Sequence, residues 1–254
     1  MIFETHAHFD DDAFNEDRDI LLKSLAENGI GTVVNVGASL ASTRTTIELS
    51  EKYPFVYGAV GVHPSEVAEL NEDNFAWLKK QCDRKKIVAV GEIGLDYYWP
   101  EPEHELQKKW FGRQIELAKE VKLPIIIHSR DAAQDTIEVM KQYQAEEVGG
   151  IVHCYSYSKE LTDTFLDMGF YFGIGGVVTF KNSKKLKEAV EYLPIEKIVL
   201  ETDSPYLTPE PNRGKRNSSL NLPYIAQAVA DLKGMTYDEV VAVTEENAKK
   251  LFRM

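Results

Sequence analysis

The chain has 254 residues, of which 43% are hydrophobic, and its formal net charge at pH 7 is −12. This length suits one large α/β domain or two small ones, and the composition excludes a fibrous or disordered protein. The negative charge argues against a protein that coats nucleic acid nonspecifically, because such binding depends on Lys and Arg contacts with phosphates. It does not exclude an enzyme that handles nucleic acid at one local site, where bound divalent cations reverse the field of acidic ligands.

No apolar run is as long as a membrane span, and the first residues have neither the basic region nor the apolar stretch of a signal peptide. We therefore expect a cytoplasmic protein without membrane association, and nothing in the sequence predicts a stable protein partner. The two cysteines, Cys82 and Cys154, have no metal-binding spacing and are too few for a disulfide framework. Cys154 should point away from the neighbouring His153 on a strand, so we expect it to be a buried thiol.

Short apolar strands alternate with amphipathic helices along the chain. The predicted strands span residues 2–8, 32–36, 55–62, 87–90, 124–128, 150–153, 170–174 and 198–201. The helices predicted between them span residues 15–28, 43–53, 71–82, 103–121, 131–143, 158–168 and 184–192. Helical patterns continue after the last strand, over residues 222–232, 237–243 and 245–252. The apolar side of the first helix is predicted to hold Ile20, Leu21, Leu22 and Leu25.

Eight strands in this alternation match a (β/α)8 TIM barrel in length and count. We predict such a barrel as a single domain over residues 1–254, with extra C-terminal helices. The alternative is a doubly wound open sheet, which needs a Gly-rich phosphate-binding turn after an early strand, and the sequence has none. Barrel enzymes carry their chemistry at the carboxyl ends of the strands and on the loops that follow. Functional side chains are therefore expected where the predicted strands end.

Five of the six histidines end predicted strands, together with one glutamate and one aspartate. These side chains are His6, His8, His63, Glu92, His128, His153 and Asp203. His6 and His8 lie two residues apart on one strand, so both project to the same face and can reach one metal ion. A single histidine at a strand end more often has a structural role, but this combination at one end of a barrel favours a metal site. The sixth histidine, His104, is expected to be a solvated helix residue.

Imidazole combined with carboxylate suits Zn, Mn, Co or Fe, whereas an all-oxygen set of ligands suits Mg or Ca. Seven groups exceed what one tetrahedral ion needs, so the economical assignment is two divalent ions bridged by a carboxylate. Glu92 is the natural bridge because it comes from the middle strand of the set. Strands one and eight are neighbours in a closed barrel, so the other ligands divide into His6, His8 and Asp203 for one ion, and His128 and His153 for the other.

Seven stretches of the chain resemble the TatD family of metal-dependent deoxyribonucleases, within the amidohydrolase-like metal hydrolases. In chain order they are residues 5–8 (THAH), 61–64 (GVHP), 91–97 (GEIGLDY), 127–132 (IHSRDA), 153–156 (HCYS), 201–207 (ETDSPYL) and 247–252 (NAKKLF). They span the whole chain in order and are very specific as a set, although His-x-His alone is not.

The resemblance implies a barrel hydrolase with two divalent ions, for which Mg, Mn, Zn, Co and Ni are candidates. One ion would be bound by His6, His8, Glu92 and Asp203, and the second by Glu92, His128 and His153.

The resemblance also implies roles for three further residues. His63 matches a residue that faces the substrate phosphate, and Arg130 lies close to the site, where its guanidinium can hold a phosphate oxygen. Glu201 resembles an acid that orients a ligand or bound water. The family usually has a Glu-Pro pair where this chain has Ser218 and Ser219, so a role carried by that glutamate is not expected here.

We predict that the enzyme hydrolyses phosphodiester bonds of DNA by metal-activated water, with Asp203 as general base or proton shuttle beside Glu92. Aromatic rings on the loops after strands four, six and eight are able to stack on bases: Tyr97, Tyr98, Trp99, Tyr155, Tyr157 and Tyr206. Basic residues supply local positive charge: Lys181, Lys184, Lys185, Arg213, Lys215 and Arg216. Such rings favour single strands or frayed ends, so we expect an exonuclease, and with the family resemblance we expect 3′–5′ polarity. Loop packing by the rings and solvation of the lysines explain these residues equally well, and the family resemblance favours DNA.

Other activities are compatible with the same metal pair. An amidohydrolase or lactonase acting on a small molecule is the main alternative, but many such enzymes bridge their metals with a carboxylated lysine at the end of strand four, where this chain has Glu92. Ester cleavage on a charged RNA is not separated from DNA cleavage by the sequence. A non-enzymatic metal protein is disfavoured, because a structural site is closed by four ligands and this chain has more.

Overall fold

The computed structural model describes residues 1–254 and has the architecture of a (β/α)8 TIM barrel. Eight parallel strands form one sheet in chain order. The strands are β1 (Ile2–Ala7), β2 (Ile30–Val36), β3 (Val56–Val60), β4 (Ile87–Asp96), β5 (Ile125–Arg130), β6 (Gly150–Val152), β7 (Tyr171–Ile174) and β8 (Ile198–Leu200). The sheet curves until β1 meets the segment after β8, where Ala7 bridges Ser204 and the Asp203 N–H donates to the His6 carbonyl. The predicted barrel is confirmed, and the open sheet is excluded.

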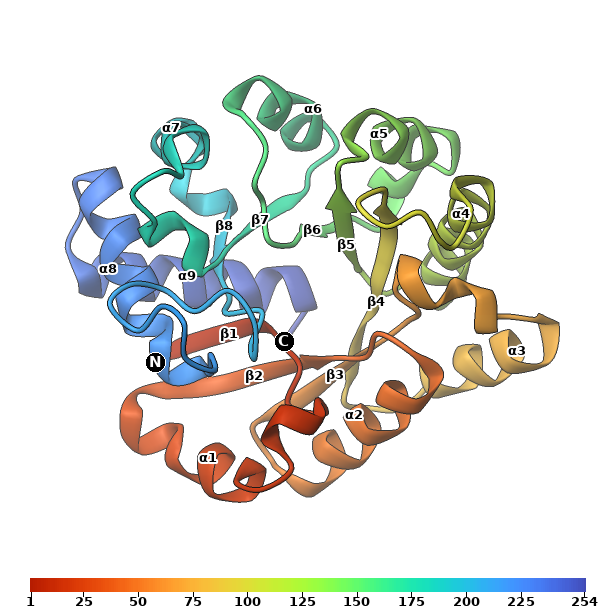
Figure 1. Cartoon of the computed structure of the whole chain (residues 1–254), viewed down its shortest axis with the longest axis horizontal. Helices are drawn as coiled ribbons and strands as arrows, with labels where there is room; N and C mark the ends of the chain where they lie inside the picture. The colour runs from red at the N-terminus through yellow and green to blue at the C-terminus, as the bar shows by residue number, and fades with distance from the viewer.

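Helices surround the strands, as Figure 1 shows. The α-helices are α1 (Arg18–Ser24), α2 (Leu40–Lys52), α3 (Glu72–Gln81), α4 (His104–Val121), α5 (Ala133–Gln142), α6 (Thr162–Asp167), α7 (Lys184–Tyr192), α8 (Leu222–Lys233) and α9 (Tyr237–Phe252). Shorter 3-10 helices are η1 (Asp12–Phe14), η2 (Ala26–Asn28), η3 (Pro64–Glu69), η4 (Ala145–Glu147), η5 (Lys159–Leu161), η6 (Gly176–Thr179), η7 (Ile195–Lys197) and η8 (Ser219–Asn221). None of these helices is both long enough and apolar enough to cross a membrane.

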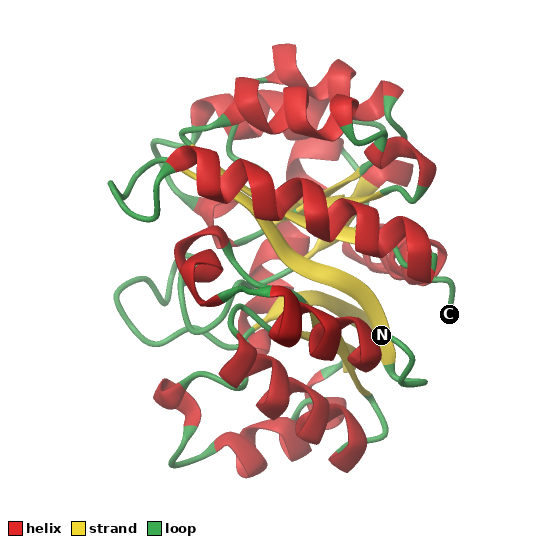
Figure 2. Ribbon diagram, turned by 90° about the vertical axis from the view of Figure 1, so that its right-hand side faces the viewer, coloured by secondary structure: helices red, strands yellow, loops and turns green.

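The last helix, α9, lies across the amino-terminal end of the barrel. Its Phe252 ring stacks on Phe3 at the start of β1, with ring centroids 5.9 Å apart. Its Asn247 amide donates to the carbonyls of Ile195 and Ile198, beside the start of β8, at 2.8 Å each. Figure 2 shows both termini on one side of the molecule and long loops on the other. With the amino-terminal end covered, the carboxyl ends of the strands are left to form the site.

Two helix predictions differ from the structure. The chain from Tyr237 to Phe252 is one helix instead of two, because the Thr244 hydroxyl donates to the Val240 carbonyl at 2.8 Å and so sits inside the helix without interrupting it. The helix expected over residues 15–28 is two short helices, α1 and η2. Ile20, expected on its apolar side, is 73% exposed, because the buried face is already made by Leu21, Leu22 and Leu25.

Strand β4 is longer than predicted and continues through Glu92 to Asp96. Gly94, with φ +147°, makes this possible, since a Cβ at that position would lie 1.9 Å from the His128 carbonyl oxygen on β5. Strand β6 is shorter than predicted and ends at Val152. Cys154 therefore does not continue a strand: its φ is +44° and its side chain is only partly buried, in contrast to the buried thiol expected there.

Candidate metal centre

Side chains with metal-ligand chemistry converge at the carboxyl ends of the strands. They are His6 and the adjacent His8 from β1, His63 after β3, Glu92 from β4, His128 from β5, His153 after β6 and Asp203 after β8. Although these residues are spread over most of the sequence, the parallel barrel brings every strand end to the same rim. The seven candidates singled out in the sequence therefore lie together in one group.

Glu92 lies at the centre of this group, and its two carboxylate oxygens face different sets of side chains. Oε2 lies 3.5 Å from His6 Nε2 and 3.6 Å from His8 Nε2. Oε1 lies 2.7 Å from both His128 Nδ1 and His153 Nε2. The Glu92 side chain is only 4% exposed, so neither oxygen is freely solvated. A carboxylate in this arrangement is able to bridge two ions.

The donors on the Oε2 side have the spacing of a tetrahedral site. His6 Nε2 and His8 Nε2 are 3.1 Å apart, and Asp203 Oδ1 lies 3.7 Å from the first and 3.4 Å from the second. Four ligands bound to zinc at ordinary bond lengths are separated from one another by about 3.3 Å. With Glu92 Oε2 as the fourth donor, these residues fit one divalent ion.

The donors on the Oε1 side form a second set that shares only Glu92 with the first. His128 Nδ1 and His153 Nε2 are 3.2 Å apart. His63 Nε2 also faces this side, 3.7 Å from Glu92 Oε1. Nitrogen donors combined with a carboxylate suit the borderline metals better than Mg or Ca.

Two of the candidate histidines have a hydrogen-bond acceptor behind the ring, on the nitrogen that points away from the centre, and a third faces a carboxylate there at a longer distance. His8 Nδ1 is 2.8 Å from the Val36 carbonyl, and His128 Nε2 is 3.2 Å from Asp96 Oδ2. His153 Nδ1 faces Glu201 Oε1 at 3.7 Å. Metal-binding histidines usually donate the far N–H to a carboxylate or carbonyl, which fixes the tautomer that leaves the other nitrogen free to bind. This pattern is a second indication that the group fits metal ions.

His63 is arranged differently from these histidines. Its Nδ1 accepts a hydrogen bond from the Ser65 N–H at 3.1 Å and lies 2.8 Å from the Ser65 hydroxyl. Burial and the neighbouring His128 lower the pKa of His63 to about 3, so the ring is neutral near pH 7. A neutral ring whose Nδ1 accepts carries its proton on Nε2. That nitrogen is therefore a donor, which suits a substrate oxygen better than a metal ion.

The family model described as TatD related DNase matches residues 3–253. The chain belongs to the TatD-related DNase family. It is 43% identical over 254 residues to the uncharacterized metal-dependent hydrolase YabD of Bacillus subtilis (strain 168), with 100% of both chains covered. It is 32% identical over 260 residues to YcfH of Escherichia coli (strain K12), covering 100% of this chain and 96% of that one. The crystal structure of YjjV, a TatD homolog from Escherichia coli K12, matches with a TM-score of 0.94 at 28% identity, covering 100% of this chain and 98% of the other.

These findings make the protein a metal-dependent hydrolase of the TatD family. In its centre, the histidines and carboxylates shift one another's pKa values. Burial alone lowers the pKa of His8, but the hydrogen bond to Asp203 and the charges of Glu92 and Asp203 raise it to about 9. Burial raises the pKa of Glu92, and the charge of His153 together with the hydrogen bonds from His128 and His153 outweighs this effect and holds it well below its usual value. Without metal, the ionised carboxylates of this centre are therefore paired with the protonated rings of His8 and His153, whereas the His63 ring is neutral.

Divalent metal binding to the TatD-family hydrolase should release protons near pH 7, and the affinity should rise as the pH approaches 9. His8 has a pKa of about 9 and is protonated at neutral pH, whereas a metal requires the neutral imidazole. Titration calorimetry of metal-stripped protein in two buffers with different ionisation enthalpies measures the protons released. The release should shrink at pH 9. Heats near pH 7 that do not depend on the buffer would contradict the prediction.

Asp96 is a residue of the centre that the sequence analysis missed. Its Oδ2 faces His128 Nε2, and its Oδ1 accepts a hydrogen bond from the Tyr98 N–H at 2.9 Å. The side chain is 4% exposed. A signal was present, because Glu92 and Asp96 are four residues apart and share a face of any strand that contains both. The signal was missed because the strand was predicted to end at Val90, before Glu92 and Asp96.

Replacing Asp96 by Asn should weaken metal binding at the His128 position about 10- to 100-fold, the usual effect of losing such a partner. The Asn carbonyl can still accept from the Tyr98 N–H, so the loop should keep its place. Competition with a fluorescent chelator measures the metal affinity, and Asp83→Asn on the exposed loop after α3 is a matched control. Unchanged affinities in the Asp96 variant would show that this carboxylate does not support His128.

Arg130 lies outside the ligand group, whereas Glu201 lies at its edge, where it forms a further set of possible donors with His6 and His153. Arg130 ends β5, is exposed, and holds its guanidinium carbon 3.8 Å from the centroid of the Tyr98 ring. Glu201 is fully buried, and its Oε1 accepts a hydrogen bond from the Cys154 N–H. Glycine is needed at position 173 beside it, since a Cβ there would lie 2.1 Å from Glu201 Oε2. Arg130 therefore belongs to the rim, and Glu201 to the layer beneath His153.

Glu4 is a second buried acid that the sequence analysis did not single out. It accepts hydrogen bonds from the Thr202 N–H at 2.8 Å and the Thr202 hydroxyl at 2.7 Å, which ties β1 to the segment that carries Asp203. Burial raises the pKa of Glu4 to about 8, so it is mostly uncharged near pH 7. Ser219, in place of the usual Glu-Pro pair, is buried next to it. Next to Ser219, the acidic side chain of the TatD-family hydrolase is thus Glu4, which β1 supplies.

The aromatic residues predicted to face nucleic acid divide into two groups. Tyr155 is 2% exposed and packs in the core, so its predicted stacking role is wrong. The hydroxyl of Tyr157 is 2.8 Å from that of Ser129, and the Tyr97 hydroxyl donates to Asp135 at 2.7 Å, beside the exposed His104. More than half of the residue surface is exposed for the remaining three: Tyr98, Trp99 and Tyr206.

The predicted basic residues also divide. Arg216 forms two hydrogen bonds with Asp17, at 2.8 and 2.6 Å, and packs over Phe14, so it holds the loop after β8 against the loop after β1. Its role is structural. The others are exposed: Lys181, Lys184, Lys185, Arg213 and Lys215.

Proposed function

We propose that this TatD-family hydrolase cleaves the phosphodiester bonds of DNA as a 3′–5′ exonuclease that prefers single strands, using two divalent ions. The observation that carries the proposal is the division of Glu92, with one oxygen directed to each of two separate donor sets. Two ions bound there would lower the pKa of a water molecule and offset the charge that develops on the phosphoryl oxygens. The DNase description of the family supports a nucleic acid substrate.

Asp203 is the residue we assign to proton transfer. Only its Oδ1 faces His6 and His8, and 15% of the side chain is exposed, against 4% for Glu92. Its pKa is held below the usual value despite burial, by the hydrogen bond with His8 and the surrounding histidines. The carboxylate is therefore ionised near neutral pH and can accept a proton from the attacking water and pass it to solvent.

His63 and Arg130 are assigned to the substrate phosphate. The His63 Nε2–H donates into the same space that Glu92 Oε1 faces. The Arg130 guanidinium forms no ion pair within the chain, so its donors are free to hold a phosphate oxygen. The cations at the centre and these two donors would surround a phosphodiester on several sides, which offsets charge where it develops.

End-labelled single-stranded DNA tests the proposal. Metal-stripped protein is resupplied with Mg, Mn, Co, Zn or Ni, one at a time, and products are separated by size. Release of mononucleotides that begins at the 3′ end and requires the ion is the expected result. Metal binding without any cleavage would reject the nuclease and favour a small-molecule amidohydrolase or lactonase, to be followed by an ester and amide screen.

A further inference from the structure

We infer that Tyr98 and Trp99 form a base-stacking subsite that receives the nucleobase next to the scissile phosphate. The inference rests on the proposed nuclease function and adds to it the part of the substrate that is recognised and the residues that recognise it. Each residue is 53% exposed, and the two rings are in edge contact with centroids 4.8 Å apart. Large exposed rings beside a polar centre are costly to leave in water and are able to stack on any base.

Arg130 holds the first ring in place. Its guanidinium carbon lies 3.8 Å from the centroid of the Tyr98 ring, and no carboxylate of the chain pairs with the guanidinium. A planar cation on one ring organises that ring and keeps its own donors available for a phosphate. Base and phosphate recognition would thus be adjacent on one nucleotide.

The subsite is fixed to the metal centre through Asp96. This buried carboxylate faces His128 Nε2 at 3.2 Å and accepts from the Tyr98 N–H at 2.9 Å. Arg130 follows His128 by two residues on β5, a distance of about 7 Å along a strand. The rings are therefore held within about one nucleotide of the centre instead of being carried on an unanchored loop.

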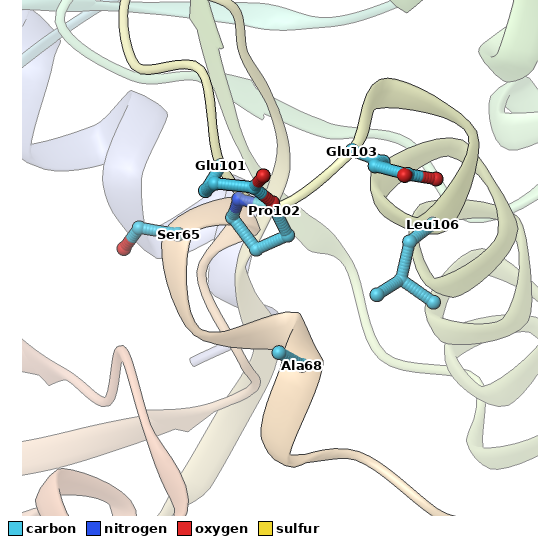
Figure 3. A pocket seen from close by; sticks show the side chains of 6 residues that line it. All are labelled: Ser65, Ala68, Glu101, Pro102, Glu103 and Leu106. Carbon is cyan, nitrogen blue, oxygen red and sulfur yellow. The ribbon is translucent and has the colours of Figure 1, made fainter.

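The segment that follows Trp99 is acidic and does not form a phosphate-binding surface. A hollow of about 430 Å³ lies between η3 and the start of α4, and Figure 3 shows its lining. The hollow is lined by Glu101 and Glu103 and has no basic residue. Two carboxylates repel a phosphate. The DNA strand is therefore expected to place a neutral base near the hollow and its phosphate backbone near Arg130.

Tryptophan fluorescence tests the subsite without catalysis. Of the three tryptophans, Trp110 is 3% exposed and Trp77 is covered by Arg44, so Trp99 is the reporter. Oligothymidylate added to metal-stripped protein should quench the emission, and Trp77→Phe should keep this quenching while Trp99→Phe removes it. Blunt duplex DNA, whose bases are already stacked, should quench much less.

Binding measured by anisotropy of a labelled oligonucleotide isolates the contribution of the base. Trp99→Ala should raise the Kd for oligothymidylate about tenfold, and Trp99→Phe should restore most of the affinity. An abasic oligonucleotide of the same length has the same backbone charge and no bases, so Trp99→Ala should leave its Kd unchanged. Equal effects of Trp99→Ala on both ligands, or no effect on either, would overturn the subsite.

The same variants separate failure of the subsite from failure of the proposed function. If only the subsite is wrong, the native protein still cleaves end-labelled DNA and Trp99→Ala cleaves it with the same kcat/KM. If the proposed function is wrong, the native protein neither binds nor cleaves the oligonucleotide with any ion, and both proposals fall. A lower kcat/KM for Trp99→Ala on oligothymidylate, rescued by Trp99→Phe, is the expected result.

Discussion

Replacing Glu92 by Gln should abolish the proposed DNA turnover and reduce bound divalent metal to at most one ion per chain. Both carboxylate oxygens face a donor set, and an amide provides one oxygen and no charge. We expect the rate to fall by at least about 10³-fold, since several kcal/mol of charge stabilisation depend on the ions. Elemental analysis of the purified variant and turnover of end-labelled DNA are the two measurements.

The matched control for this variant is Glu188→Gln, on the exposed face of α7, which should keep both ions and full activity. Circular dichroism of the Glu92 variant establishes that the barrel is intact. Two tightly bound ions together with native turnover in a folded Glu92→Gln protein would exclude the bridging assignment.

Replacing Asp203 by Asn should lower kcat by about 10²- to 10⁴-fold while saturating metal still fills the centre. Asn retains an oxygen to face His6 and His8 but cannot take a proton from water. Asp203 has φ +56°, a left-handed conformation that Asn adopts more readily than most residues, so the backbone should not shift. Single-turnover rates at saturating metal and substrate measure this effect apart from binding.

Asp163→Asn, on the surface helix α6, controls for the loss of a carboxylate far from the centre. It should leave the single-turnover rate unchanged. A native rate in Asp203→Asn with both ions bound would assign proton transfer to another group, and loss of one ion at saturating metal would make Asp203 chiefly a ligand.

The barrel was predictable because each of its strands and helices is encoded locally. Apolar runs such as residues 125–127 at the start of β5, and amphipathic segments such as His104–Val121, carry their own periodicity. A parallel barrel follows from their alternation. The convergence of His6, Glu92 and Asp203 on one rim follows from the same rule, because parallel strands all end on one side. Boundaries were predicted less well. The pattern in residues 15–28 did not reveal two short helices, and Thr244 did not break α9.

The tertiary structure alone decided how these side chains are used. No pattern in the sequence shows that the oxygens of Glu92 face opposite donor sets, that Ser65 fixes the tautomer of His63, or that Asp96 lies behind His128. It also does not distinguish Trp99, which is exposed, from Tyr155, which is buried. The physical reason is that the secondary structure of a residue, and so its place on a strand, is determined largely by its neighbours in the chain. Hydrogen-bond partners and solvent exposure depend on groups that only folding brings within a few ångströms.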